Sequence, residues 1–251
     1  MKSAKMYLEK VTEILTKITN EETESINQAA KLIAERIEKD QLIHVFGSGG
    51  HSIMGAMEVF WRAGGFANVN PLFPAGLSLV DSHPNIERTA GIAGSIVRFY
   101  GVGADDVLLI INVNGINPLT IQSAMEAKDL GAHVIAITSP EFASNVPKNM
   151  AARHSSNKNL HELAEVVVNA HVPAGDSVVK IPGLEQTLGA TSTYAVCYAA
   201  NLIFMRVAEI LIEKGVNPPI WTSANVAGGD EANKAYLEEY RPRVHHLYPM
   251  F

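Results

Sequence analysis

Apolar residues in the first forty positions recur at intervals of three and four. This spacing places the apolar side chains of Met6–Ile18 on one face of a helix. It does the same for a second segment, which starts at Ile26 and ends before Asp40. The sequence therefore predicts two amphipathic helices before the first strand.

Short apolar segments then alternate with helical patterns as far as Asn169. Two of them, Leu108–Ile111 and Val134–Ile137, are continuously apolar, which is typical of parallel strands buried on both faces. The alternation predicts a three-layer α/β/α sandwich, doubly wound, with a parallel central sheet. The expected order is strand Leu42–Phe46, helix Ile53–Arg62, strand Ala67–Val69, helix Gly94–Tyr100, strand Val107–Ile111, helix Pro118–Leu130, strand Val134–Thr138 and strand Val166–Asn169.

The pattern changes after the last of these strands. Gly183–Lys214 predicts one long helix with a polar opening at Glu185–Thr187 and an apolar body, buried in the core or against another subunit. A polar and aromatic tail, Asn217–Phe251, follows it. Because no linker or repeat divides the chain, we expect one domain over residues 1–251, with a core at about 26–214, an N-terminal helical extension at 1–25 and a tail at 215–251.

The first candidate site is a glycine-rich loop between a strand and a helix. Leu42–Phe46 runs directly into Gly47-Ser48-Gly49-Gly50-His51-Ser52. Glycines let the backbone approach an anion closely, and the free N–H groups of the following helix favour negative charge. The spacing fits neither the mononucleotide G-x-x-x-x-G-K-[ST] pattern nor the dinucleotide G-x-G-x-x-G pattern. A small phosphorylated or otherwise anionic ligand is expected instead.

Charge and cysteine content narrow the partners and the compartment. A formal net charge of −6 and a pI near 5.8 argue against nucleic acid and anionic membranes as partners, since both require a basic face. The single cysteine, Cys197, lies in an apolar run and is expected to be a packing residue. The chain has no signal-peptide pattern at its start and no uninterrupted apolar stretch of membrane-spanning length, so a cytoplasmic protein is expected.

The order of these pieces resembles a sugar isomerase (SIS) domain. That family has a G-x-G-x-S-type loop after the first strand, a polar S-x-S-G-type loop after a later strand, and a catalytic glutamate near the start of a late helix. The matching segments here are Gly47–Ser52, Asn112–Asn117 and Glu185. Other segments, among them Glu87–Thr89 and Ser223–Glu231, resemble a bacterial branch that is described as phosphosugar or phosphoheptose isomerases.

The resemblance implies a phosphosugar ligand bound by the two loops and their surroundings. Asn112 and Asn114 stand where the family usually has serines, and an amide can still donate hydrogen bonds but is longer than a hydroxyl. The expected substrate-binding residues are Gly47, Ser48, Gly49, Gly50, Ser52, Asn112, Asn114, Gly115, Asn117 and Arg88.

Aldose–ketose isomerisation through an enediol needs a base that moves a proton between two carbons. Glu185 is the first candidate, because burial of a glutamate raises its pKa toward the working pH. His51, Glu58 and His83 are the other candidate catalytic residues, with His83 able to act from a neighbouring subunit. Arg62 stands where zinc-using phosphoheptose isomerases have a metal-binding glutamate, so neither a metal nor another cofactor is expected.

The sequence therefore favours a cytoplasmic phosphosugar isomerase that forms a homodimer or homotetramer. The alternative is a non-catalytic phosphosugar sensor or regulatory binding protein, because SIS folds serve both purposes and a fold does not fix a function. The sequence identifies neither the sugar nor the direction of the reaction.

Overall fold

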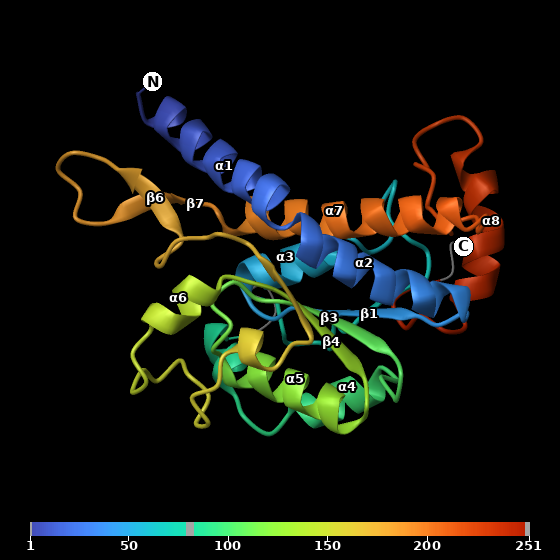
Figure 1. Ribbon diagram of the computed structural model, residues 1–251, viewed down its shortest axis with the longest axis horizontal. Helices are drawn as coiled ribbons and strands as arrows, with labels where there is room; N and C mark the ends of the chain where they lie inside the picture. Colours follow the sequence, from blue (N-terminus) through green and yellow to red (C-terminus); the bar gives the residue numbers. More distant parts are fainter. Residues whose placement is uncertain (1, 79–82, 249–251) are drawn as a thin grey trace.

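A parallel sheet of five strands forms the centre of the protein (Figure 1). The computed structural model describes residues 2–78 and 83–248. The strand order in the sheet is β2-β1-β3-β4-β5. The strands of this sheet are β1 (Ile43–Phe46), β2 (Val69–Pro71), β3 (Val107–Ile111), β4 (His133–Thr138) and β5 (Val166–Asn169).

Helices cover both faces of the sheet and extend beyond it at both ends of the chain. The α-helices are α1 (Lys2–Glu21), α2 (Thr23–Glu38), α3 (Gly50–Glu58), α4 (Ala93–Phe99), α5 (Pro118–Asp129), α6 (Pro140–Asn145), α7 (Ser192–Glu213) and α8 (Gly229–Tyr240). Two short 3₁₀ helices, η1 (Pro84–Arg88) and η2 (Leu160–Glu162), lie in loops at the carboxyl ends of the strands.

Strand β3 shows how the sheet divides the interior into two cores. All five of its residues are buried, as the continuous apolar run predicts. Val107, Leu109 and Ile111 pack in the core under α2, α3 and α7, whereas Leu108 and Ile110 pack in the core under α4 and α5. The doubly wound α/β/α sandwich predicted from the sequence is therefore confirmed.

Most predicted elements lie within a few residues of their predicted bounds. The strands Val107–Ile111 and Val166–Asn169 have the bounds that the sequence indicates. Helix α3 begins three residues before its predicted start and ends four residues before its predicted end, because the chain turns at Trp61, whose φ is +46°. Strand β2 is displaced by two residues toward the C-terminus, from Ala67–Val69 to Val69–Pro71.

The prediction of one long helix over Gly183–Lys214 is wrong. Helix α7 begins only at Ser192, and the preceding segment is half of an antiparallel hairpin formed by β6 (Ser177–Lys180) and β7 (Thr187–Ala190). Gly189 has φ +75°, and its missing Cβ leaves room for the Tyr7 ring of α1, since a Cβ there would lie 2.9 Å from that ring. We call residues 177–190 the β6–β7 hairpin.

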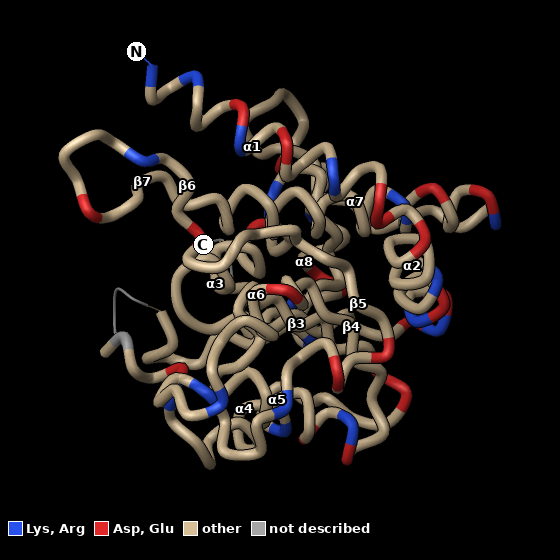
Figure 2. The backbone as a smooth tube through the Cα atoms, turned by 60° about the vertical axis from the view of Figure 1, so that its left-hand side comes forward, with Lys and Arg blue, Asp and Glu red and all other residues tan. Residues whose placement is uncertain are grey.

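Helix α7 is the central helix of its layer and contacts α1, α2 and α3. By length and composition it could cross a membrane, but ten of its residues are buried in the protein, which is the pattern of a core helix. Helix α1, which packs against α7, is more exposed. Helix α1 has only Ile14 and Ile18 buried, and it extends with the β6–β7 hairpin away from the sheet (Figures 1 and 2).

Candidate functional site

The candidate site is the place at the sheet edge where the loops that follow β1 and β3 meet, and we call this place the crevice. In the strand order β2-β1-β3 the chain moves in opposite directions from β1, so the switch point of the doubly wound sheet lies between β1 and β3. The helices that follow these two strands lie on opposite faces, α3 beside α7 and α5 beside α4 (Figure 1). Ligands of open α/β sheets bind at this point, outside the carboxyl ends of the strands.

The glycine-rich loop makes a tight connection from β1 into α3. A Cβ at Gly47 would lie 2.2 Å from the carbonyl oxygen of Ser52, so only glycine fits there. Gly49 precedes the helix with φ +82°, in the left-handed region that favours glycine. Its N–H lies 3.5 Å from the Leu77 carbonyl oxygen. The first N–H groups of α3, which begins at Gly50, therefore face the crevice edge of the sheet without partners inside the helix.

Asn112 connects the two loops by hydrogen bonds at both ends of its side chain. Its Nδ2 donates to the Ser52 hydroxyl at 3.1 Å, and its Oδ1 accepts from the Gly115 N–H at 2.7 Å. Asn112 and Ser52 are both buried. Their side chains bind each other and the neighbouring loop, whereas the sequence implied that both would bind substrate. The Ser52 hydroxyl keeps its own proton for donation, whereas Asn112 acts as the brace between the loops.

His51 adds a second connection between the same loops. Its Nε2 accepts the Val113 N–H at 3.1 Å. Burial lowers the pKa of His51 by more than the nearby Asp176 carboxylate raises it. A neutral ring that accepts at Nε2 carries its proton on Nδ1, so His51 holds the loop after β3 and retains one N–H donor.

Asp176 fixes the start of α7 beside this crevice, and no motif in the sequence pointed to this residue. Its Oδ1 accepts the N–H groups of Thr191 and Ser192 at 2.8 and 2.7 Å, and its Oδ2 accepts the Ser192 hydroxyl at 2.6 Å. A carboxylate at a helix N-terminus satisfies orphan N–H groups and favours the helix dipole. Because Asp176 comes just before β6, it also joins the two ends of the β6–β7 hairpin.

Glu87 reaches the glycine-rich loop from η1. An ideal Cβ on Gly49 would lie 2.4 Å from Glu87 Oε2, so the carboxylate covers the residue that precedes α3. Burial raises the pKa of Glu87 above its ordinary value, and the Arg88 guanidinium opposes this rise without cancelling it. The sequence analysis singled out Glu87 only as part of Glu87–Thr89, a segment that resembles the bacterial branch of the family. Its contact with Gly49, nearly forty residues away, exists only in the fold.

Several expected substrate-binding residues do lie at the crevice. Ser48 is 1% exposed, and its hydroxyl has no hydrogen-bond partner within the described structure. Asn114 is partly exposed, and its Oδ1 accepts the Ile116 N–H at 3.3 Å. Asn117 donates through Nδ2 to the Ala152 carbonyl, while its buried Oδ1 has no partner among the described residues. Arg88 lies on η1 next to Glu87 and is exposed.

Three of the four expected catalytic residues are not brought together. Glu185 is exposed at the turn of the β6–β7 hairpin, where its carbonyl accepts from Lys180 Nζ, and not in the first turn of a buried helix. Figure 2 shows this hairpin standing away from the body. His83 is exposed and its Nδ1 accepts the Asn85 N–H at the start of η1. Of the four expected catalytic residues, His51 is the one that lies at the crevice and joins the two loops.

Glu58 is the last residue of α3, so it lies at the end of α3 that is farther from the glycine-rich loop. Its side chain lies beside α7. Its carboxylate pairs with Arg62 at 3.3 Å, and Asn201 Nδ2 lies 3.4 Å from it. Burial and the Glu58 carboxylate raise the pKa of the nearby Cys197 thiol to about 11, which keeps the thiol protonated. Glu58 and Cys197 therefore belong to the contact between α3 and α7.

The described residues contain no group of three or more His, Cys, Asp or Glu side chains placed to hold a metal ion. The residues searched are 2–78 and 83–248.

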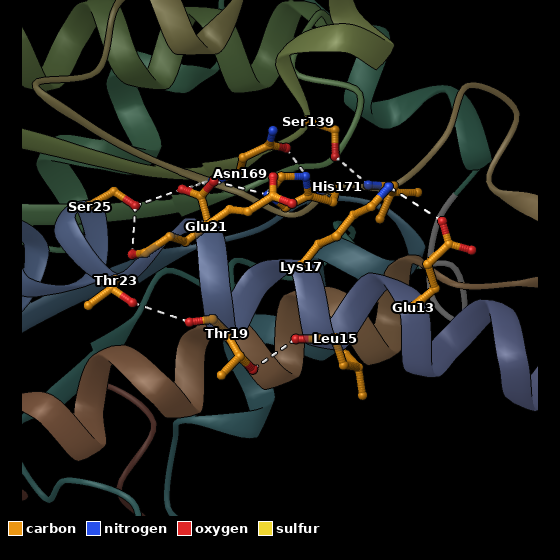
Figure 3. A network of polar contacts seen from close by, with 12 residues as sticks. Glu13, Leu15, Lys17, Thr19, Glu21, Thr23, Ser25, Ser139, Asn169 and His171 are labelled. Atoms are coloured by element: carbon orange, nitrogen blue, oxygen red, sulfur yellow. Dashed lines mark hydrogen bonds and ion pairs between the residues drawn. The ribbon is translucent and has the colours of Figure 1, made fainter.

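A separate cavity of about 450 Å³ lies farther along the same edge of the sheet, between α1 and the ends of β4 and β5. Figure 3 shows the polar contacts beside it, in which side chains of α1 face Ser139, Asn169 and His171. The Glu22 carboxylate accepts the Asn169 N–H and contacts His171 Nε2, both at 3.0 Å. The Ser139 hydroxyl accepts the Val172 N–H at 3.0 Å. These contacts attach the junction of α1 and α2 to the end of β5.

Comparison with known proteins agrees with the resemblance seen in the sequence. The SIS domain model matches residues 6–139, more than half of the chain. A UPF0309 protein of Geobacillus kaustophilus is 32% identical over 241 residues, which cover 95% of this chain and 94% of the relative. A UPF0309 protein of Thermoanaerobacter pseudethanolicus is 36% identical over 248 residues, which cover 96% of this chain and 98% of the relative.

Among solved structures, the chain is similar to the phosphoheptose isomerase GmhA of Neisseria gonorrhoeae. The two share 17% sequence identity and a TM-score of 0.49, over 81% of this chain and 94% of that chain.

Proposed function

Because the chain belongs to the SIS domain family, we propose that it binds a phosphosugar in the crevice between β1 and β3 and isomerises it between aldose and ketose. The observation that supports this best is the start of α3. There Gly47 and Gly49 bring the backbone into a tight turn, and the first N–H groups of the helix point to the switch point of the sheet. Such a terminus favours a phosphate group.

The surrounding side chains suit a ligand that is held by hydrogen bonds more than by cations. The buried Ser48 hydroxyl has no partner among the described residues. The Asn114 amide is partly exposed, and within the same residues its Nδ2 makes no hydrogen bond. Ser52 and Asn112 brace the loops from below. In this proposal the helix N–H groups hold the phosphate, while Ser48 and Asn114 orient the rest of the ligand.

A thermal-shift screen tests the binding step. We expect five-, six- and seven-carbon sugar phosphates to raise the melting temperature, whereas the same sugars without phosphate do not. A ligand present at about 100 times its Kd stabilises the native state by about 2.7 kcal/mol. Stabilisation by the free sugars as strong as that by their phosphates would contradict the proposal.

Binding without turnover is the second candidate function. Its support is that Glu185 and Glu58, the two glutamates that the sequence offered as catalytic residues, both lie away from the crevice in this chain. Isomerisation through an enediol exchanges a carbon-bound proton with solvent, whereas a sensor leaves that proton in place. Incubation of the bound sugar phosphate in deuterated water, followed by mass spectrometry, distinguishes the two.

The proposal includes a homodimer or homotetramer. Large apolar side chains remain exposed along one side of α1 and α7, among them Leu8 at 67%, Tyr194 at 53%, Met205 at 60% and Ile212 at 60%. A second copy would cover them, since symmetric dimers pair the same surface on both chains. Sedimentation should give a dimer or tetramer at micromolar concentration, and Met205→Lys should shift it toward the monomer.

A further inference from the structure

We propose that Glu87 is the acid–base residue of the crevice, reaching from η1 over Gly49 to a phosphosugar held at the start of α3. This inference rests on the proposed function, and it places in the crevice the carboxylate that Glu185 and Glu58 do not supply.

The position of the carboxylate is the first reason. Glu87 Oε2 lies so close to Gly49 that a Cβ on that residue would be 2.4 Å from it and 3.3 Å from Glu87 Cδ. Gly49 is the last residue before α3, so the carboxylate stands next to the N–H groups that would receive the phosphate. A ligand bound at the loop would therefore meet this carboxylate.

The absence of a fixed partner is the second reason. No ion pair within 4.0 Å involves Glu87 anywhere in residues 2–78 and 83–248. Among the described residues, the charged group that acts on the Glu87 carboxylate is the Arg88 guanidinium. Arg88 is its neighbour on η1 and is itself exposed. Helix α5, which packs against η1, has no ionisable side chain in its first eight residues, Pro118–Met125.

A purely structural role would give Glu87 different properties. A carboxylate that caps a helix is stabilised in its charged form, which lowers its pKa. Glu87 shows the opposite, since burial raises its pKa. A raised pKa suits a group that must both accept and return a proton near neutral pH.

The proposed reaction moves one proton between carbons and one between oxygens. The Glu87 carboxylate accepts the proton from the carbon beside the carbonyl. The electrons of that C–H bond form the double bond of the enediol as the carbonyl oxygen is protonated. Glu87 then returns its proton to the former carbonyl carbon, while the neighbouring hydroxyl loses a proton and becomes the new carbonyl. No outside oxidant or reductant takes part.

The experiment compares wild type with Glu87→Gln and with Glu238→Gln, an exposed glutamate on α8 that serves as the charge-matched control. Calorimetric titration with inorganic phosphate at about pH 7.5 measures the anion site without knowledge of the sugar. Glu87→Gln should bind phosphate several-fold more tightly than wild type, because one negative charge beside the site is removed. Glu238→Gln should match wild type.

Deuterium incorporation into a sugar phosphate that binds measures the chemical step. We expect Glu87→Gln to retain the ligand and to lose exchange by about 10²–10⁴-fold, the usual contribution of a general base. Glu87→Asp keeps the charge but withdraws the carboxylate by one carbon, so it should bind phosphate as wild type does and exchange slowly. This variant keeps the test decisive if Glu87→Gln does not fold.

The outcomes separate this inference from the proposed function. If wild type binds and exchanges a sugar phosphate and Glu87→Gln exchanges within a few-fold of it, Glu87 is not the acid–base residue and the proposed function stands. If wild type binds sugar phosphates without exchange, the isomerase reaction and the role of Glu87 are both wrong, and phosphosugar binding stands. If wild type binds no sugar phosphate, the proposed function is wrong. Glu87→Gln that binds inorganic phosphate no better than wild type then shows that Glu87 does not face the anion.

Discussion

Glu87 and Glu185 carry the same side chain in opposite surroundings. Glu87 is packed against Gly49 at the start of α3, and burial raises its pKa. Glu185 is exposed at the turn of the β6–β7 hairpin, which stands away from the body of the protein (Figure 2). The sequence pointed to Glu185, because its position before an apolar helix resembled the family pattern. The difference shows that the candidate acid–base chemistry of this chain is decided by what surrounds a carboxyl group.

The largest expected effect is the difference in deuterium exchange between variants of these two glutamates. Glu87→Gln should lower deuterium exchange by about 10²–10⁴-fold, while Glu185→Gln should leave it within a few-fold of wild type. The measurement is mass spectrometry of a bound sugar phosphate in deuterated water. A large loss in Glu185→Gln alone would reverse the comparison and indicate that the β6–β7 hairpin acts at the crevice of a second copy.

Alanine substitutions at two glycines with similar φ test the position of Glu87. Gly49 and Gly183 have φ of +82° and +88°, but a Cβ meets the Glu87 carboxylate at the first and nothing within 4 Å at the second. Alanine at either position should cost about 1–2 kcal/mol for the left-handed conformation. Only Gly49→Ala should also displace Glu87 and slow exchange. Urea denaturation and the exchange assay check this, and equal exchange in both variants would contradict the placement of Glu87.

Burial of Glu87 should make the folding stability of the protein depend on pH. Below the ordinary glutamate pKa the carboxyl is protonated in both the folded and the unfolded chain, so it has no net effect. As pH rises from there through the raised pKa of the folded state, the unfolded chain releases its proton more readily and stability falls. Glu87→Gln should therefore gain melting temperature relative to wild type as pH rises from about 4 to 8. A gain that shrinks over this range would contradict the burial of Glu87.

The smallest effect is expected from the exposed amide of the second loop. Asn114→Ser should leave stability and phosphosugar affinity almost unchanged, because Asn114 makes one long hydrogen bond to its own loop. Asn112→Ser should cost about 1–3 kcal/mol, since it leaves buried groups of Ser52 and Gly115 without partners. Thermal denaturation with and without ligand measures both. An equal loss in the two variants would show that the loops are not joined through Asn112.

The sequence by itself determined the sheet, the two N-terminal helices and the glycine-rich loop. Periodicity and continuous apolar runs depend on neighbouring residues, so Val107–Ile111 and Val166–Asn169 are read from the chain without knowledge of the fold. Gly47 is also a local matter, because its tight contact is with the carbonyl of Ser52, five residues away. These features follow from short-range geometry.

Only the tertiary structure decided which side chains share the crevice. Asp176 caps α7 across fifteen residues of hairpin, and Glu87 meets a glycine that lies in another layer of the fold. Helix periodicity extended α7 too far for the same reason: at Gly189, whose φ is +75°, the Tyr7 ring of α1 occupies the space that a Cβ would take. Burial, and with it the raised pKa of Glu87, is a property of the packed surroundings, which no window of the sequence contains.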